Sequence, residues 1–428
     1  MLRVMLAVGV GRRRVDVVDD LTGRKTRQLV GHSKDVLVLA FSPNGTGLAS
    51  GSKDGVRLWD PVTGAQLSFM TGKHNGDVTA LVFSPDGNML CSGGSDGSVA
   101  LWWALVGSEE SVRGLSFKCF LSEHLQVGDE VLGLQFSTDG EFVAALRGYA
   151  NASLWRVSSG ERMLRIKDNS ALSLTGRNFS ADSGYFVSGR KSRIVVWDLA
   201  SRQECRVISA HKDYVSFLAF SPRQPALLAS VGSRDKRAYV SDTETGAVIA
   251  TLSHGSWVGS LAWAPDGGTI ACSDNGWRVC AWNTRGMGQS AVSLRDKPCA
   301  PLATFQVGQA SNPSCALEQQ GGKHVLKDIM GPSYVAFSAC GRSIVCGSEN
   351  GAGLEVWDAC ELGLGRARFR FTLHGSCVAI GRNEERERAG ALAFAMGHHP
   401  RLGECSSARW LDAELVQLVC SQVPLEAW

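Results

Sequence analysis

The chain has 428 residues, of which 44% are hydrophobic and 20% charged, and its formal net charge is +3. These values are typical of a globular protein, and they exclude a global affinity for polyanions. With 49 Gly and only 12 Pro, the composition predicts many tight turns rather than disorder.

The first eleven residues, MLRVMLAVGVG, are apolar, but Arg3 interrupts them and no small-residue cleavage site follows. We therefore expect no signal peptide. No apolar run reaches the roughly 18 residues that a membrane helix needs. The 13 Cys are scattered without a C-x-x-C pair, as expected for buried thiols in a reducing compartment. The sequence thus predicts a cytoplasmic or nuclear protein that has no contact with a membrane.

The N-terminal stretch at 4–20 has the same pattern as a later stretch at 47–60, and the run KTRQLV (25–30) follows it as a further strand. The full pattern then recurs along the chain. Each copy has three short runs rich in Val, Leu, Phe and Trp, separated by turns such as Ser-Pro-Asp-Gly. The copies lie at 36–60, 78–103, 131–156, 174–198, 214–242, 257–283 and 333–358.

A fourth strand-like run follows several copies, for example AQLSFM after Asp60 and AVIATL after Gly246. Four short antiparallel strands make one sheet, which cannot bury both of its faces alone. Radial stacking of the sheets would bury them. Two longer spacings predict insertions at 104–114 and 308–332, which the repeat does not require and which are candidates for protein-specific binding elements.

These repeats resemble the WD-repeat β-propeller family, whose units of about 40 to 45 residues carry Gly-His near one end and Trp-Asp near the other. Residues that carry the resemblance include His32, His74, His211, His254 and the Trp-Asp pair that ends in Asp60. The resemblance covers residues 1–381. It implies an all-β fold, a single propeller of four-stranded antiparallel blades.

In the family, a His, a Ser or Thr, an Asp and a Trp of each unit form a buried hydrogen-bonded set with a structural role. The resemblance implies two complete sets here, one of His32, Ser50, Asp54 and Trp59 and one of His74, Ser92, Asp96 and Trp102. Elsewhere the set is incomplete, since Ser241 stands at a Trp position and Cys272 at a Ser position.

A propeller must join its first and last blades, because open sheet edges promote aggregation. We expect residues 376–381 to pair with residues 4–9, so that 1–30 and 374–381 close an eight-bladed ring. Seven blades are the alternative, and they would leave 1–19 and 367–381 unpaired. Residues 382–428 form a C-terminal extension in this interpretation, or an extra partial blade.

No sequence motif predicts catalysis, a metal or a cofactor. The stretch GGSDG (93–97) fits the G-x-S-x-G pattern of hydrolases, but a strand and not a helix follows it, so Ser95 is expected to be a turn residue. We expect Ser95→Ala to be nearly neutral and Asp96→Ala to be destabilising. GVGRRR (9–14) lacks the third glycine of a dinucleotide site, and the adjacent His398 and His399 lack spaced metal-ligand partners.

Basic residues concentrate in the turns between second and third strands and in the segments before first strands, which share one face of the disc in the family. We expect this face to bind an acidic or phosphorylated partner segment, and a solvated basic surface is the alternative. Tyr214 and Trp257 are candidate aromatic anchors on the same rim, or packing residues. The candidate binding residues are Arg13, Lys34, Lys53, Lys73, Arg190, Lys191, Arg193, Lys212, Tyr214, Arg234, Lys236, Arg237 and Trp257.

The predicted function is that of a non-catalytic scaffold or adaptor that presents its loops to other proteins, as part of a multiprotein complex. We expect no small-molecule ligand. A propeller that binds nucleic acid through the basic face is one alternative, although the turns supply few stacking residues. A propeller hydrolase is another, and it would need acids, bases or metal ligands that converge at the central channel.

Overall fold

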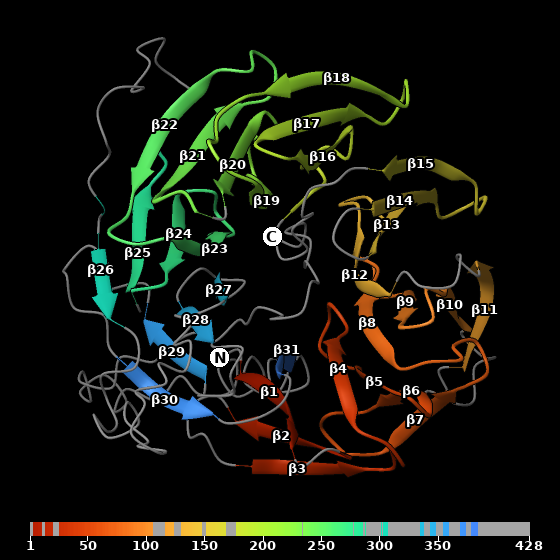
Figure 1. Cartoon of the computed structure of the whole chain (residues 1–428). Helices are drawn as coiled ribbons and strands as arrows, with labels where there is room; N and C mark the ends of the chain where they lie inside the picture. Colours follow the sequence, from red (N-terminus) through yellow and green to blue (C-terminus); the bar gives the residue numbers. More distant parts are fainter. Residues whose placement is uncertain are drawn as a thin grey trace, which may run out of the picture.

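A computed structural model of the chain describes residues 3–10, 13–19, 25–105, 116–123, 130–147, 151–167, 177–232, 234–276, 278–285, 287, 301, 303–306, 334–337, 343–347, 354–358, 369–373 and 378–383. The regular structure in these residues is entirely β, in eight antiparallel sheets arranged as a ring (Figure 1). The predicted all-β propeller is confirmed. The described part contains no helix that is long and apolar enough to cross a membrane.

The first four sheets are numbered in the order in which the chain enters them. Sheet 1 holds β1 (Arg3–Val10), β2 (Arg14–Asp19), β3 (Lys25–Val30) and β31 (Val378–Asn383). Sheet 2 holds β4 (Val36–Phe41), β5 (Leu48–Ser52), β6 (Gly55–Trp59) and β7 (Gln66–Met70). Sheet 3 holds β8 (Val78–Phe83), β9 (Met89–Gly94), β10 (Val99–Leu105) and β11 (Ser116–Glu123). Sheet 4 holds β12 (Val131–Phe136), β13 (Phe142–Arg147), β14 (Asn151–Arg156) and β15 (Arg162–Lys167).

The other four sheets complete the ring. Sheet 5 holds β16 (Tyr185–Arg190), β17 (Arg193–Asp198) and β18 (Gln203–Ile208). Sheet 6 holds β19 (Val215–Phe220), β20 (Leu227–Gly232), β21 (Arg237–Asp242) and β22 (Val248–Ser253). Sheet 7 holds β23 (Val258–Trp263), β24 (Thr269–Asp274), β25 (Arg278–Asn283) and β26 (Ala303–Gln306). Sheet 8 holds β27 (Tyr334–Phe337), β28 (Ser343–Gly347), β29 (Leu354–Asp358) and β30 (Phe369–Leu373).

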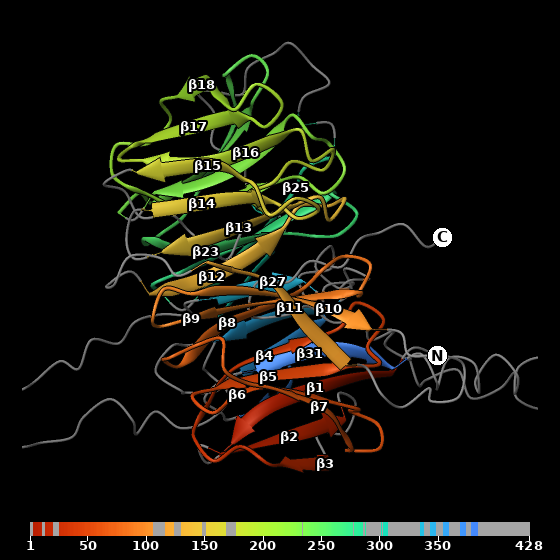
Figure 2. The ribbon, with the colours of Figure 1, turned by 90° about the vertical axis from the view of Figure 1, so that its right-hand side faces the viewer.

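The first strands lie near the centre of the ring and the fourth strands at its periphery (Figure 1). Seen from the side, the strands run roughly along the axis of the ring (Figure 2). Because successive strands are antiparallel, the turn from the second to the third strand returns to the end of the sheet where the first strand begins. These turns and the segments before first strands therefore share one face of the disc.

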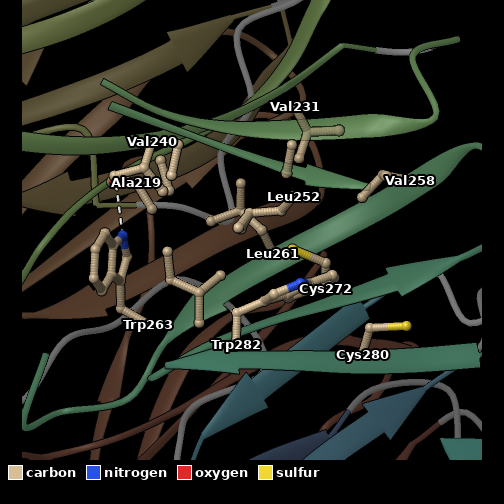
Figure 3. Packing of buried hydrophobic residues seen from close by; sticks show 14 of the residues in the cluster. Ala219, Val231, Val240, Leu252, Val258, Leu261, Trp263, Cys272, Cys280 and Trp282 are labelled. Atoms are coloured by element: carbon tan, nitrogen blue, oxygen red, sulfur yellow. Dashed lines mark hydrogen bonds between the residues drawn. The ribbon is translucent and has the colours of Figure 1, made fainter. Parts of the chain in front are cut away.

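Apolar side chains fill the spaces between neighbouring sheets. Separate buried clusters join sheets 1 and 2, 2 and 3, 3 and 4, 4 and 5, 5 and 6, 6 and 7, and 7 and 8. Between sheets 6 and 7, Trp263 packs beside Val240 and donates from Nε1 to the Ala219 carbonyl at 2.9 Å (Figure 3). Sheets 2 to 7 each pack against two neighbours, so their strands can bury both faces, as the radial stacking of the repeats predicts.

A serine closes the turn between the first and second strands of several sheets. In sheet 3, Ser84 Oγ donates to Asp86 Oδ1 at 2.5 Å and accepts from the Met89 amide at 2.9 Å. Gly87 in this turn has a φ of 74°, a conformation that most residues adopt only at a cost. The Ser-Pro-Asp-Gly sequence therefore fixes a reversal between two strands, and its recurrence fixes the spacing of the sheets.

The two ends of the described chain meet in sheet 1. β1 pairs with β31 antiparallel, with Met5 opposite Gly381 and Val8 opposite Val378. β31 also contacts β4 of sheet 2, so it holds the inner position that first strands hold in other sheets. β31 runs to Asn383, two residues past the boundary expected at 381. The expected extension, from residue 384 on, lies outside the described residues.

Three features of the strands differ from the sequence analysis. Sheet 5 has three strands in the described residues. The expected first strand at 174–179 is described only from residue 177 on, and Phe179 in it forms a single β-bridge to Phe186. β11 and β26 are fourth strands that the sequence analysis did not identify. The insertion expected at 104–114 starts later, because β10 extends to Leu105; 106–115 and 307–333 lie outside the described residues.

Candidate functional site

His32 is the centre of a buried set of hydrogen bonds in sheet 2. Its Nδ1 lies 2.5 Å from Asp54 Oδ1, and its Nε2 lies 2.7 Å from Ser50 Oγ. Trp59 Nε1 donates to the same Ser50 oxygen at 2.8 Å. The Ser50 hydroxyl can then donate to Nε2, which assigns a neutral imidazole with its proton on Nδ1. The set therefore links the segment before β4 to β5, to the β5–β6 turn and to β6.

His74 has a different set in sheet 3. Its Nε2 lies 2.7 Å from Ser92 Oγ, and Trp102 Nε1 donates to Ser92 at 2.8 Å. Asp96 Oδ1, however, is 3.9 Å from His74 Nδ1. Ser98 lies between them, 2.5 Å from Nδ1, and donates to Asp96 at 2.6 Å. The four residues of this set therefore lie together, and the Ser98 hydroxyl, two residues after the aspartate, links Asp96 to His74.

Sheet 6 contains a set that the sequence analysis missed. His211 Nδ1 lies 2.7 Å from Asp235 Oδ2, and Nε2 lies 2.8 Å from Ser230 Oγ. Tyr239 packs its ring edge-to-face against His211, with centroids 4.9 Å apart. Ser241, at the position of the missing Trp, has a buried hydroxyl without a hydrogen-bond partner in the described residues. A search that did not require Trp would have found this set.

Sheet 7 keeps the histidine without its hydrogen bonds. Neither ring nitrogen of His254 has a hydrogen-bond partner in the described residues, and Nδ1 lies 3.9 Å from Asp274 Oδ2. Cys272 occupies the position that a serine holds in sheet 2, and burial raises the pKa of its thiol. Trp282 packs edge-to-face on the imidazole at 4.7 Å. Ring packing therefore replaces hydrogen bonding at this histidine.

The set in sheet 2 predicts that acid destabilises the protein. Burial lowers the pKa of His32 below its ordinary value, although Asp54 opposes this shift. Burial opposes the ionisation of Asp54, but hydrogen bonds from the Ser33 amide and His32 outweigh it and lower the pKa of Asp54. Both groups bind protons more tightly when unfolded. We expect the melting temperature to fall as the pH drops from about 6.5, and further below about 4.

Thermal unfolding between pH 8 and 3 measures this dependence. His32→Gln removes one of the titrating groups. The variant should melt at a lower temperature than wild type at neutral pH, and its melting temperature should change less than that of wild type between pH 7 and 5. A wild-type curve that is flat across that interval would contradict the account of His32.

Asp96 and Ser95 are neighbours that allow a matched test of the set in sheet 3. Asp96 accepts from the Asn75 amide at 2.6 Å and from the Ser98 amide at 3.0 Å, besides the Ser98 hydroxyl. Ser95 Oγ accepts from the Asp77 amide at 2.9 Å. We expect Asp96→Ala to lower the free energy of unfolding by about 1 to 3 kcal/mol. Ser95→Ala should lower it by about 0.5 to 1.5 kcal/mol, so this substitution is not neutral as the sequence alone predicted. Equal melting temperatures for the two variants would contradict this ranking.

Turns of sheets 5 and 6 meet the segments before β19 and β23 on the face that the sequence analysis expected to be basic. The Val215 amide, at the start of β19, donates to the Lys191 carbonyl in the β16–β17 turn at 2.8 Å. The Val258 amide, at the start of β23, donates to the Asp235 carbonyl at 3.4 Å. Each first strand is thus joined to the turn of the preceding sheet. We call this region, made by residues 190–193, 212–214, 234–237 and 257, the basic arc.

Most predicted binding residues are exposed, and they are unevenly distributed around the ring. Arg13 belongs to sheet 1, Lys34 and Lys53 to sheet 2, and Lys73 to sheet 3. The basic arc holds all the others, which are Arg190, Lys191, Arg193, Lys212, Tyr214, Arg234, Lys236, Arg237 and Trp257. The structure therefore brings nine of the predicted residues together and leaves the other four apart.

Few carboxylates neutralise the basic arc. Arg190 pairs with Glu204, and Arg234 Nε lies 3.8 Å from Asp213. Asp235 is engaged by His211. In the described part of the chain, no carboxylate lies within ion-pair distance of Lys191, Arg193, Lys212, Lys236 or Arg237. The arc therefore carries several positive charges that are available to a ligand.

The described residues contain no group of three or more His, Cys, Asp or Glu side chains that could hold a metal ion. The four described histidines, His32, His74, His211 and His254, lie within the sheets instead. What the geometry offers chemically is a rigid surface with ammonium and guanidinium donors, which suit carboxylate and phosphate groups.

The fold and its repeats define a propeller. The model of the WD domain, G-beta repeat family matches residues 23–60, 65–102, 202–242 and 246–283. Each match spans the last strand of one sheet and the first three of the next. These four ranges of the chain are WD repeats.

A curated relative shares one part of the sequence. Nuclear distribution protein PAC1 of Komagataella phaffii is 35% identical over 72 residues, which is 16% of this chain and 14% of that protein. The match thus spans about one seventh of the relative's length. WD repeats are typical of protein-interaction scaffolds, and the family is generally non-catalytic.

Proposed function

We propose that this protein is a scaffold that binds acidic or phosphorylated segments of partner proteins on the basic arc. The observation that carries the proposal is the group of cationic side chains without carboxylate partners on neighbouring turns of sheets 5 and 6. A stiff ring supports the proposal, because the turns that carry these side chains are already positioned and lose little backbone freedom on binding.

Two existing ion pairs support an acidic ligand. Arg190 contacts Glu204 through two nitrogens, and Arg234 faces Asp213. Two of the four guanidinium groups of the arc, those of Arg190 and Arg234, therefore already interact with carboxylates of this chain. A ligand with carboxylates or phosphates would supply the same chemistry to Lys191 and Lys236.

Binding of a fluorescent glutamate-rich peptide, with and without a phosphoserine, tests the proposal by anisotropy at low and high salt. Affinity should fall as salt screens the charges. The double variant Lys191→Glu and Lys236→Glu should weaken binding by at least about tenfold at low salt. The matched control, Lys34→Glu with Lys53→Glu in sheet 2, makes the same charge change away from the arc and should weaken it less. Salt-independent binding, or equal losses in both double variants, would refute the proposal.

A further inference from the structure

Tyr214 and Trp257 occupy the same position in neighbouring sheets. Each immediately precedes the first strand of its sheet, β19 in sheet 6 and β23 in sheet 7, and these two strands contact each other. The same position holds an acid in sheets 2 to 4, namely Asp35, Asp77 and Glu130. An aromatic side chain at this position is therefore not required by the repeat.

Both rings face solvent. Tyr214 is 49% exposed and Trp257 is 47% exposed. Other aromatic rings in similar exposure have a partner: the Arg57 guanidinium lies 3.7 Å above the centre of the Phe69 ring. In the described residues, no hydrogen bond or ring contact engages the side chain of Tyr214 or Trp257. Solvent-exposed apolar side chains that lie close together mark binding sites more often than isolated exposed apolar side chains do.

The rings alternate with the positive turns. The Lys191 turn adjoins the start of β19, next to Tyr214, and the turn that holds Arg234 and Lys236 adjoins the start of β23, next to Trp257. Along the arc the order is therefore basic turn, aromatic ring, basic turn, aromatic ring. Neighbouring packed sheets lie about 10 Å apart, a distance that about three residues of an extended chain span.

We propose that the basic arc binds an extended acidic segment whose apolar side chains pack on Tyr214 and Trp257. This inference rests on the proposed function and adds the apolar residues to the description of the ligand. The acidic groups contact the turns at Lys191 and Lys236, while the rings hold the apolar side chains. Two rings are too few to stack successive bases along a nucleic-acid strand, which favours a peptide as the occupant.

The test uses two acidic peptides that differ at the apolar positions, one with leucines among glutamates and one with serines in their place. Binding of each peptide to the full chain is measured for wild type, Tyr214→Ala, Trp257→Ala and the Lys191→Glu, Lys236→Glu double variant. The leucine peptide should bind wild type more tightly than the serine peptide. Each alanine variant should lose about tenfold in affinity for the leucine peptide and little for the serine peptide.

The outcomes separate this inference from the proposed function. If both alanine variants bind the leucine peptide as wild type does while the charge variant binds both peptides weakly, the aromatic site is refuted and the acid-binding face stands. If wild type binds neither peptide, both proposals fail. If a single-stranded oligonucleotide binds more tightly than either peptide and depends on the two rings, the occupant is a nucleic acid and the peptide is refuted. Unchanged melting temperatures confirm that the variants are folded.

Discussion

Removal of residues 378–428 should strongly destabilise the protein, because it deletes β31 and leaves one edge of β1 without its partner. The register between Arg3 and Asn383 at one end and Val8 and Val378 at the other would be lost. At about 1 kcal/mol for each ladder hydrogen bond, the cost is on the order of 5 kcal/mol. The unpaired edge should also promote association between chains.

The matched control is a chain that ends after residue 383, which retains β31 and loses only residues 384–428. We expect this chain to melt close to the full-length protein and to have the same oligomeric state by size-exclusion chromatography with light scattering. The shorter chain should melt at a clearly lower temperature or aggregate. Identical melting curves and masses for the two truncations would contradict ring closure by β31.

Trp155→Ala should destabilise the protein more than substitution of any His, Ser or Asp in the hydrogen-bonded sets. Trp155 is fully buried at the junction of sheets 3 and 4, in a cluster with Leu134, Phe136 and Val157. Removal of an indole from such a cluster costs about 3 to 5 kcal/mol, from lost burial and the cavity that remains.

Trp257→Ala is the control for this prediction, since it removes the same side chain from the surface. Its effect on the free energy of unfolding should be within about 0.5 kcal/mol. Urea denaturation followed by circular dichroism measures both variants. Similar midpoints for Trp155→Ala and Trp257→Ala would contradict the placement of Trp155 in the core.

Much of the fold could be predicted from the sequence because the turn residues recur at fixed distances from the strands. Ser84, Asp86 and Gly87 define one reversal through local contacts that a short motif encodes completely. β11 and β26 could not be placed in the same way. They follow long connections, and their pairing with β10 and β25 is decided by tertiary contact rather than by a turn motif.

The hydrogen-bonded sets were only partly predictable for a similar reason. His32, Ser50, Asp54 and Trp59 follow the family's pattern and lie together as it implies. Ser98 shows the limit of the pattern, because its role depends on a side chain that reaches between two others in space. The sequence also could not show whether Tyr214 and Trp257 are buried or exposed, because it fits both a core and a surface role for these side chains. The packing of the sheets distinguishes the two roles and leaves both rings exposed.

The claim that the basic arc is the binding surface can be tested directly by zero-length carbodiimide cross-linking of an acidic peptide to the full chain. The reagent joins a carboxylate of the peptide to a lysine in contact with it, and mass spectrometry identifies that lysine. The account predicts cross-links at Lys191, Lys212 and Lys236. Cross-links confined to Lys34, Lys53 and Lys73, or to Lys25 and Lys167 on peripheral strands, would contradict it.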